Sequence, residues 1–99
     1  MKQVEFQVAL FKGSEAAKGY LFSLDSAGVT MNFVAHKRAN QWRVSHFETG
    51  LCVDHGAPTR AEAVQGFTDA VDVGAFRFPS LAQKASLRPT LNTLPGDVS

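Results

Sequence analysis

Apolar and polar residues alternate along the first half of the chain, which predicts short β-strands with one face in water. In the first run every second residue is apolar: Val4, Phe6, Val8 and Leu10. Further runs follow at 20–24, 29–35, 42–46 and 51–53. Residues 12–19 are polar and contain glycine at 13 and 19, which predicts a loop or a single helical turn. Tight connections between the runs predict an antiparallel meander of four or five strands.

The period of the apolar residues becomes helical after residue 58. Thr59 and Glu62 have the spacing of a capping box, in which each side chain accepts a hydrogen bond from the backbone N–H of the other residue. Behind them, one helix face is apolar: Ala63, Val64, Phe67, Ala70 and Val71. Gly74 suits the left-handed residue that ends many helices. The sequence therefore predicts an α+β domain, a two-layer sandwich with one principal helix over about 60–73 packed on the sheet.

The C-terminal quarter is divided by prolines. Ser80 is positioned to cap a helical turn or two that ends before Pro89. Residues 89–99 contain two prolines and isolated leucines, which predicts a flexible tail. The expected organisation is therefore a single domain over 1–88 followed by this tail.

Composition limits the class of protein. The chain has 99 residues, 44% of them hydrophobic, which is enough for one folded domain and argues against global disorder. Ten Lys and Arg against nine Asp and Glu give a net charge of +1, which excludes a polybasic coat protein for nucleic acid. The longest apolar run is four residues, 8–11, so we expect no membrane partner. With a single cysteine, Cys52, no internal disulfide can form, and a cytoplasmic location is expected.

No catalytic or cofactor motif is found in the sequence, so a non-enzymatic protein without a cofactor is expected. The best metal-ligand candidates are Cys52 and His55, three residues apart, with His46 and His36 upstream and Asp54 beside them. A zinc site normally shows two such close pairs, and only one is present. Alternation also places His46 and Cys52 where they would not obviously converge. The expectation is therefore that no metal is bound.

Charge is unevenly distributed. Residues 26–47 carry three bases and no acid, whereas residues 48–74 carry five acids and one base. The basic segment predicts one alternative function, a nucleic-acid-binding hairpin over 36–46. Its phosphate-binding and stacking residues would be Lys37, Arg38, Arg43 and Trp42. The other interpretation is that the charged turn is simply solvated and that Trp42 belongs to the core.

Residues 40–73 run in the order strand, turn, strand, capped helix, through Gln41-Trp42-Arg43-Val44, Thr49-Gly50 and Pro58-Thr59-Arg60-Ala61-Glu62-Ala63. In outline this order resembles the three-stranded-sheet-plus-helix modules at the arm-binding ends of some phage integrases. It is also similar to small antitoxin-like ββα domains. The resemblance implies nucleic-acid binding, although the acidic helix departs from the basic surroundings usual in such modules.

Apolar residues at positions where alternation predicts solvent favour a protein partner. Phe47 and Val34 are in such positions, and Phe11 extends past the polar face of the first strand. Phe76, Arg77 and Phe78 form a trio of the kind enriched at interface hot spots. The leading hypothesis is a small non-enzymatic module, of a phage- or plasmid-type accessory or inhibitor kind. It would bind a protein partner or a second copy of itself through its sheet face and edge. The alternative is that the C-terminal segment folds back over the sheet and buries these aromatic residues.

Overall fold

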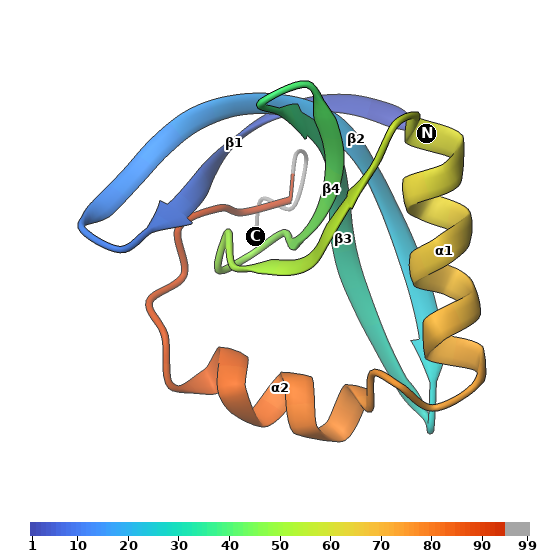
Figure 1. The fold of residues 1–99 in the computed structure, drawn as a ribbon. Helices are drawn as coiled ribbons and strands as arrows, with labels where there is room; N and C mark the ends of the chain where they lie inside the picture. The colour runs from blue at the N-terminus through green and yellow to red at the C-terminus, as the bar shows by residue number, and fades with distance from the viewer. Residues whose placement is uncertain (95–99) are drawn as a thin grey trace.

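The computed structural model describes residues 1–94 and shows an antiparallel sheet followed by two helices (Figure 1). Neighbouring strands are consecutive in the sequence, in the order β1-β2-β3-β4-β5. The elements are β1 Lys2–Leu10, β2 Gly13–Ser26, β3 Val29–Arg38, β4 Gln41–His46, β5 Cys52–Ala57, α1 Arg60–Asp72 and α2 Phe78–Ser86. The predicted α+β class and the antiparallel meander are therefore confirmed.

Strand β2 is longer than the sequence pattern predicts. Residues 13–19, expected to be a loop or a helical turn, pair with β1 along its whole length, from Leu10 opposite Gly13 to Lys2 opposite Leu21. Most side chains of this stretch are exposed, so its polar composition is tolerated. The backbone hydrogen bonds to β1, rather than an apolar face, make this segment a strand. The result is a long hairpin that curves away from α1 (Figure 1).

Both helices cover one face of the sheet and enclose the helix-side core. Its buried residues are Met31, Phe33, Val44, Ala63, Phe67, Val71 and Phe78. The ring of Phe33 is at its centre, with its centroid 4.8 Å from that of Phe67 on α1 and 5.5 Å from that of Phe78 on α2. The two helices are therefore held by one aromatic cluster on the middle strand.

The ends of α1 follow the sequence prediction closely. The Thr59 hydroxyl accepts a hydrogen bond from the Glu62 N–H at 3.2 Å. At the other end, the Gly74 N–H bonds to the Val71 carbonyl and Gly74 has φ of 82°. This is the left-handed geometry that favours glycine after a helix. Helix α2 has nine residues and is longer than the turn or two expected. It begins at Phe78, so Ser80 is inside it and is not its cap.

The opposite sheet face carries a second cluster, the strand-side core. It is formed by Val4, Phe6, Val8, Val34 and Phe47, with Ala17, Leu21 and Leu94 packed against it. The curved hairpin carries β1 over this face, and the Ala9 N–H donates to the Gly50 carbonyl at 2.9 Å. Gly19 permits a close approach of β2 to β3, because a Cβ at this position would collide with Val34 and lie 2.7 Å from the Ala35 carbonyl oxygen. Both faces of the sheet are thus covered from within the chain.

The segment after α2 is attached to the domain up to Leu94, the last residue that the structure describes. The N–H groups of Leu91 and Asn92 donate to the Glu48 carbonyl, and Asn92 is buried. Leu94 packs against the strand-side core, whereas residues 95–99 of the expected flexible tail lie outside the described residues. Within residues 1–94, neither helix has the length and apolar character needed to cross a membrane.

Candidate functional site

The structure buries two of the four residues expected to bind a protein partner. Phe47 is 1% exposed in the strand-side core and Phe78 is 0% exposed in the helix-side core. Phe76 is half-buried against Phe67, with ring centroids 5.1 Å apart, and Arg77 is exposed. The expectation that Phe47 and Phe78 present apolar side chains to a partner is corrected, because β1 covers the first and the helices enclose the second.

The four residues of the expected basic hairpin are divided between the two sheet faces. Lys37 and Trp42 are directly paired across β3 and β4. Trp42 is half-buried against the helix-side core, with its ring 6.1 Å from that of Tyr20. Arg38 and Arg43 point to the other face, where they line a groove together. One continuous surface of all four residues is therefore not formed.

The histidines considered as metal ligands also point to opposite faces. His36 packs edge-on against Phe6 in the strand-side core, whereas His46 packs edge-on against Phe33 in the helix-side core. Among residues 1–94 no three His, Cys, Asp or Glu side chains are arranged to hold a metal ion. The side chain of His55 lies outside the described part of the structure.

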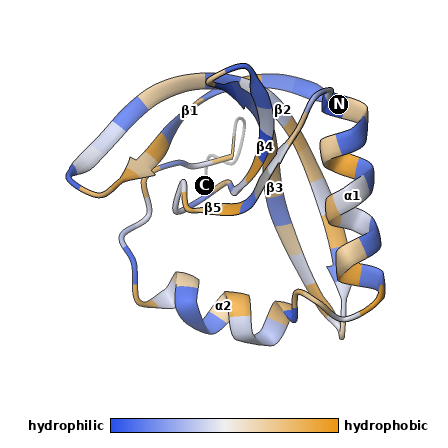
Figure 2. Cartoon of the chain, viewed as in Figure 1, coloured by the Kyte–Doolittle hydropathy of each residue, from blue (hydrophilic) through white to orange (hydrophobic). Residues whose placement is uncertain are grey.

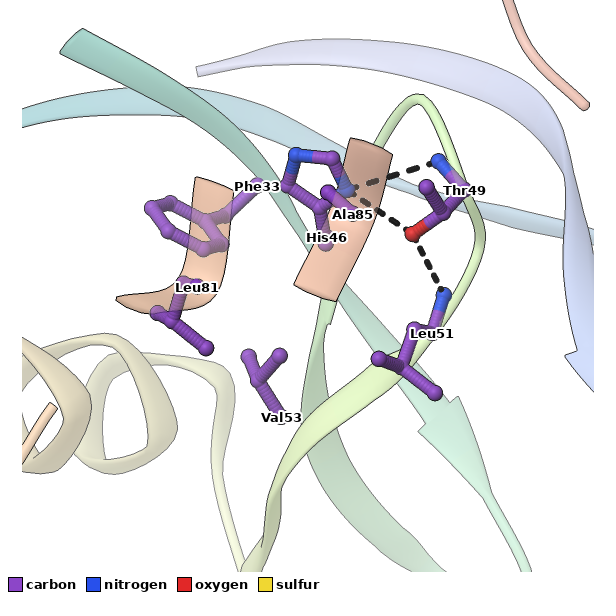
Figure 3. Close-up of a pocket in the computed structure, with 7 residues that line it drawn as sticks. All are labelled: Phe33, His46, Thr49, Leu51, Val53, Leu81 and Ala85. Carbon is purple, nitrogen blue, oxygen red and sulfur yellow. Dashed lines mark hydrogen bonds between the residues drawn. The ribbon is translucent and has the colours of Figure 1, made fainter. Parts of the chain in front are cut away.

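A small pocket lies between α2 and the sheet (Figure 3). It is lined by Phe33, His46, Thr49, Leu51, Val53, Leu81 and Ala85. Its volume of about 10 Å³ is far smaller than the roughly 300–1,000 Å³ of most small-molecule sites. One wall is polar, because His46 Nδ1 and Thr49 Oγ1 are 2.8 Å apart.

The polar groups of this pocket have the order of a hydroxyl, an imidazole and a carboxylate. His46 Nε2 is 3.5 Å from Glu48 Oε1, and Asn32 Nδ2 donates to the other Glu48 oxygen at 2.9 Å. The Thr49 hydroxyl also accepts from the Leu51 N–H at 3.3 Å. Burial lowers the pKa of His46, and the neighbouring Glu48 carboxylate opposes this shift. Because His46 and Thr49 are both buried and hydrogen bonded within one turn, these groups shape the β4–β5 connection.

The most exposed apolar side chain of the described residues is at the tip of the β1–β2 hairpin. Phe11 is 100% exposed, and the preceding Leu10 is 36% exposed. Figure 2 shows this hydrophobic end of β1 next to the turn. Two grooves, of about 320 and 300 Å³, flank the tip and share Ala9 and Leu10 as walls.

Cationic side chains surround this tip. One groove contains Arg38 and Arg43, the other contains Arg88, and neither is lined by an acidic residue. Lys12, in the turn itself, is exposed. We call these residues the hairpin-tip surface: Leu10, Phe11, Lys12, Arg38, Arg43 and Arg88. The sequence already indicates Phe11, at the centre of this surface, as an apolar residue beyond the first strand; it does not indicate which cations gather around it.

Two arginines line the first groove, and one of them, Arg38, has its Nη2 3.5 Å from Glu15 Oε2. His36 forms the floor, where its Nε2 is 2.8 Å from the Ser45 hydroxyl. Burial and the charges of Arg38 and Arg43 lower the pKa of His36 to about 4. The imidazole is therefore neutral at pH 7, and the positive potential of the groove comes from the guanidinium groups.

Comparison of the chain with protein-family models, with curated proteins and with solved structures gave no match. Surface chemistry is therefore the guide to function.

Proposed function

We propose that this chain is a small non-enzymatic module that binds a protein partner through its hairpin-tip surface. The observation that carries the proposal is the complete exposure of Phe11 beside Leu10. A phenylalanine side chain buries enough area to dominate a small interface, and its exposure in water is unfavourable. Both sheet faces are already covered, so the apolar contact is offered by the hairpin tip rather than by the sheet face.

The charges around the tip indicate the chemistry of the partner. Arg38, Arg43, Arg88 and Lys12 make a cationic rim around an apolar centre. Interfaces combine such a centre with a polar rim, and opposite charge on the partner favours association. We therefore propose a partner with an apolar pocket and an acidic border, met in the cytoplasm, where the single Cys52 would remain reduced.

A nucleic acid is the competing partner, since Phe11 could stack on a base while arginines contact phosphates. The position of the cations supports a protein instead. Lys37 and Trp42 are on the other sheet face from Arg38 and Arg43, which shortens any cationic track along the groove. Binding to single strands needs such a track, because it follows the backbone of the nucleic acid.

The test compares Phe11→Ser with Val73→Ser, a matched control at the end of α1. Val73 is 81% exposed, so both changes remove an exposed apolar side chain without altering a core. Tagged proteins are incubated with cell lysate, with and without nuclease, and washed at moderate salt. We expect a protein to be retained by the wild type and by Val73→Ser and lost with Phe11→Ser. If Phe11→Ser retains the protein as well as the wild type does, the proposal is contradicted. It is also contradicted if nuclease treatment removes the retained protein.

A further inference from the structure

The groove lined by Arg38 and Arg43 is suited to one particular chemical group of a partner, and this inference rests on the proposed function. We infer that this groove holds a carboxylate of the partner between the guanidinium groups of Arg38 and Arg43. Its apolar half, formed by Val8, Leu10 and Phe11, would receive the aliphatic or aromatic part of the same segment. The occupant is thus an acidic protein segment with an apolar residue next to its carboxylate.

Arg43 is the main observation for this site. Its Nε is buried and has no hydrogen-bond partner within residues 1–94. A buried donor without an acceptor destabilises a fold, because its lost hydrogen bonds to water are not replaced. The internal contacts of the chain thus do not account for a guanidinium at this position. A bound carboxylate would supply an acceptor for this side chain, because a guanidinium presents a fork of donors that matches two carboxylate oxygens.

Arg38 can contribute without losing a strong internal partner. Its Nη2 is 3.5 Å from Glu15 Oε2, and the two side chains are 42% and 59% exposed. Exposed ion pairs of this kind contribute little to stability, so Arg38 can exchange Glu15 for a ligand carboxylate at little cost. The influence of both arginines on the pKa of His36 shows that their charges act on the same part of the groove.

The shape of the groove favours a carboxylate over a run of phosphates. The two cations that line the groove come from β3 and β4, and its apolar residues come from β1 and the turn that follows it. One charge next to one apolar group is the pattern of an acidic peptide segment. A nucleic-acid strand would bring several phosphates, whereas two cations line this groove.

Cys52 makes the groove measurable. It is the single cysteine, it is exposed, and it lines the same groove as Arg43. The probe is 3-phenylpropanoate, which carries one carboxylate and one aromatic ring, compared with its neutral amide and with phenyl phosphate. The first readout is the rate at which iodoacetamide alkylates Cys52. The second is the pKa of His36 measured by NMR, which a bound anion raises because it offsets the two arginine charges.

We expect the carboxylate to slow alkylation with a dissociation constant of roughly 1–10 mM, as suits a ligand of this size. The amide should have at least tenfold less effect. Arg43→Gln should weaken carboxylate binding about tenfold, while the matched control Arg77→Gln, at an exposed position on another surface, leaves it unchanged. The NMR spectrum also shows whether Arg43→Gln is folded.

Equal protection by the amide, or none by the carboxylate, overturns the inference. Stronger protection by phenyl phosphate and by the oligonucleotide dT12 overturns it in favour of a phosphate ligand. Failure here is separate from failure of the proposed function. If the lysate partner depends on Phe11 but the carboxylate does not bind, the protein-binding module stands and the carboxylate site does not.

Discussion

The side-chain amide of Asn92 hydrogen bonds with both backbone groups of Gln7. The Gln7 N–H donates to Asn92 Oδ1 at 2.6 Å, and Asn92 Nδ2 donates to the Gln7 carbonyl at 3.0 Å. The same Nδ2 donates to the Phe47 carbonyl at 2.7 Å. One amide therefore takes the place of a peptide group in a neighbouring strand and ties β1 to the turn after β4. It also occupies part of the β1 edge, which would otherwise be open to pairing with another chain.

Replacing Asn92 with alanine should destabilise the domain. The change removes three hydrogen bonds and leaves the Phe47 carbonyl, which lies in a buried environment, without this donor. We expect the free energy of unfolding to fall by about 2–3 kcal/mol, measured by urea unfolding with Trp42 fluorescence. Thr93→Ala, at the exposed neighbouring position, should change it by less than about 0.5 kcal/mol. Equal effects of the two substitutions would show that Asn92 does not anchor the segment.

A second prediction concerns the contact of Gly50 with β1. Gly50 has φ of 69°, and a Cβ there would collide with the Gln7 carbonyl and lie 2.8 Å from the Ala9 nitrogen. Gly28 has φ of 76° and no atom within 4 Å of a Cβ built on it. Gly28→Ala should therefore cost about 1–2 kcal/mol from the left-handed backbone alone.

Gly50→Ala should cost at least about 3 kcal/mol, because displacement of β1 is added to the same backbone strain. Thermal unfolding of the two variants provides the measurement. The difference between them isolates the closure of β1 over the strand-side core. Similar losses of stability in both would mean that β1 is not held tightly against Gly50.

Local patterns predict α1 well, and non-local packing explains the rest. The capping residue Thr59 and the left-handed Gly74 are properties of the helix itself, so they are visible in the sequence. The burial of Phe47 depends on β1, more than thirty residues earlier, curving over the sheet. An alternating strand pattern states which residues share a face and not what covers that face. For this reason the alternation wrongly assigns Phe47 to solvent.

The candidate site is only partly visible in the sequence for the same reason. Arg38 and Arg43 are recognisable as a pair of cations in a hairpin, and they do share one face. Phe11 joins them only because β1 and β2 fold back over that face, and Arg88 because the segment after α2 returns to the hairpin. Contacts between such distant segments leave no periodic signal.

His36 should make stability depend on pH between about 4 and 6.5. Its pKa is about 4 in the folded chain, against 6.5 for an unperturbed histidine, so the unfolded state binds the extra proton in this range. The contribution of the neutral His36 to the free energy of unfolding is then fully present above pH 6.5. It is lost as the pH falls toward 4, by about 3 kcal/mol at most.

His36→Gln tests this, because glutamine keeps a polar partner for Ser45 and does not titrate. Denaturant unfolding of both proteins at several pH values gives the slope. In this window we expect the free energy of unfolding of the variant to depend less steeply on pH than that of the wild type. The difference between the two slopes should be up to about 1.4 kcal/mol per pH unit. His46, whose pKa is also lowered, is present in both proteins, so its contribution cancels in the comparison. An unchanged slope would exclude His36 as the source.

Arg43 provides the last prediction, in which stability and binding change in opposite directions. Arg43→Met keeps an unbranched apolar stem and removes the buried Nε that lacks a partner within residues 1–94. The free energy of unfolding should rise by about 0.5–1 kcal/mol, since an unsatisfied donor and the repulsion between two like charges near His36 are relieved. Arg38→Met, which removes only an exposed ion pair with Glu15, should lower it by at most about 1 kcal/mol.

A higher free energy of unfolding for Arg43→Met would indicate that the guanidinium of Arg43 does not serve the fold. A residue whose removal stabilises the fold is not retained for folding, and stability is commonly reduced where a site must bind a ligand. If Arg43→Met is more stable and no longer responds to 3-phenylpropanoate in the Cys52 alkylation assay, the guanidinium serves a ligand. If Arg43→Met is less stable by about 1 kcal/mol or more, Arg43 supports the fold, and its buried Nε is compensated by packing of its stem.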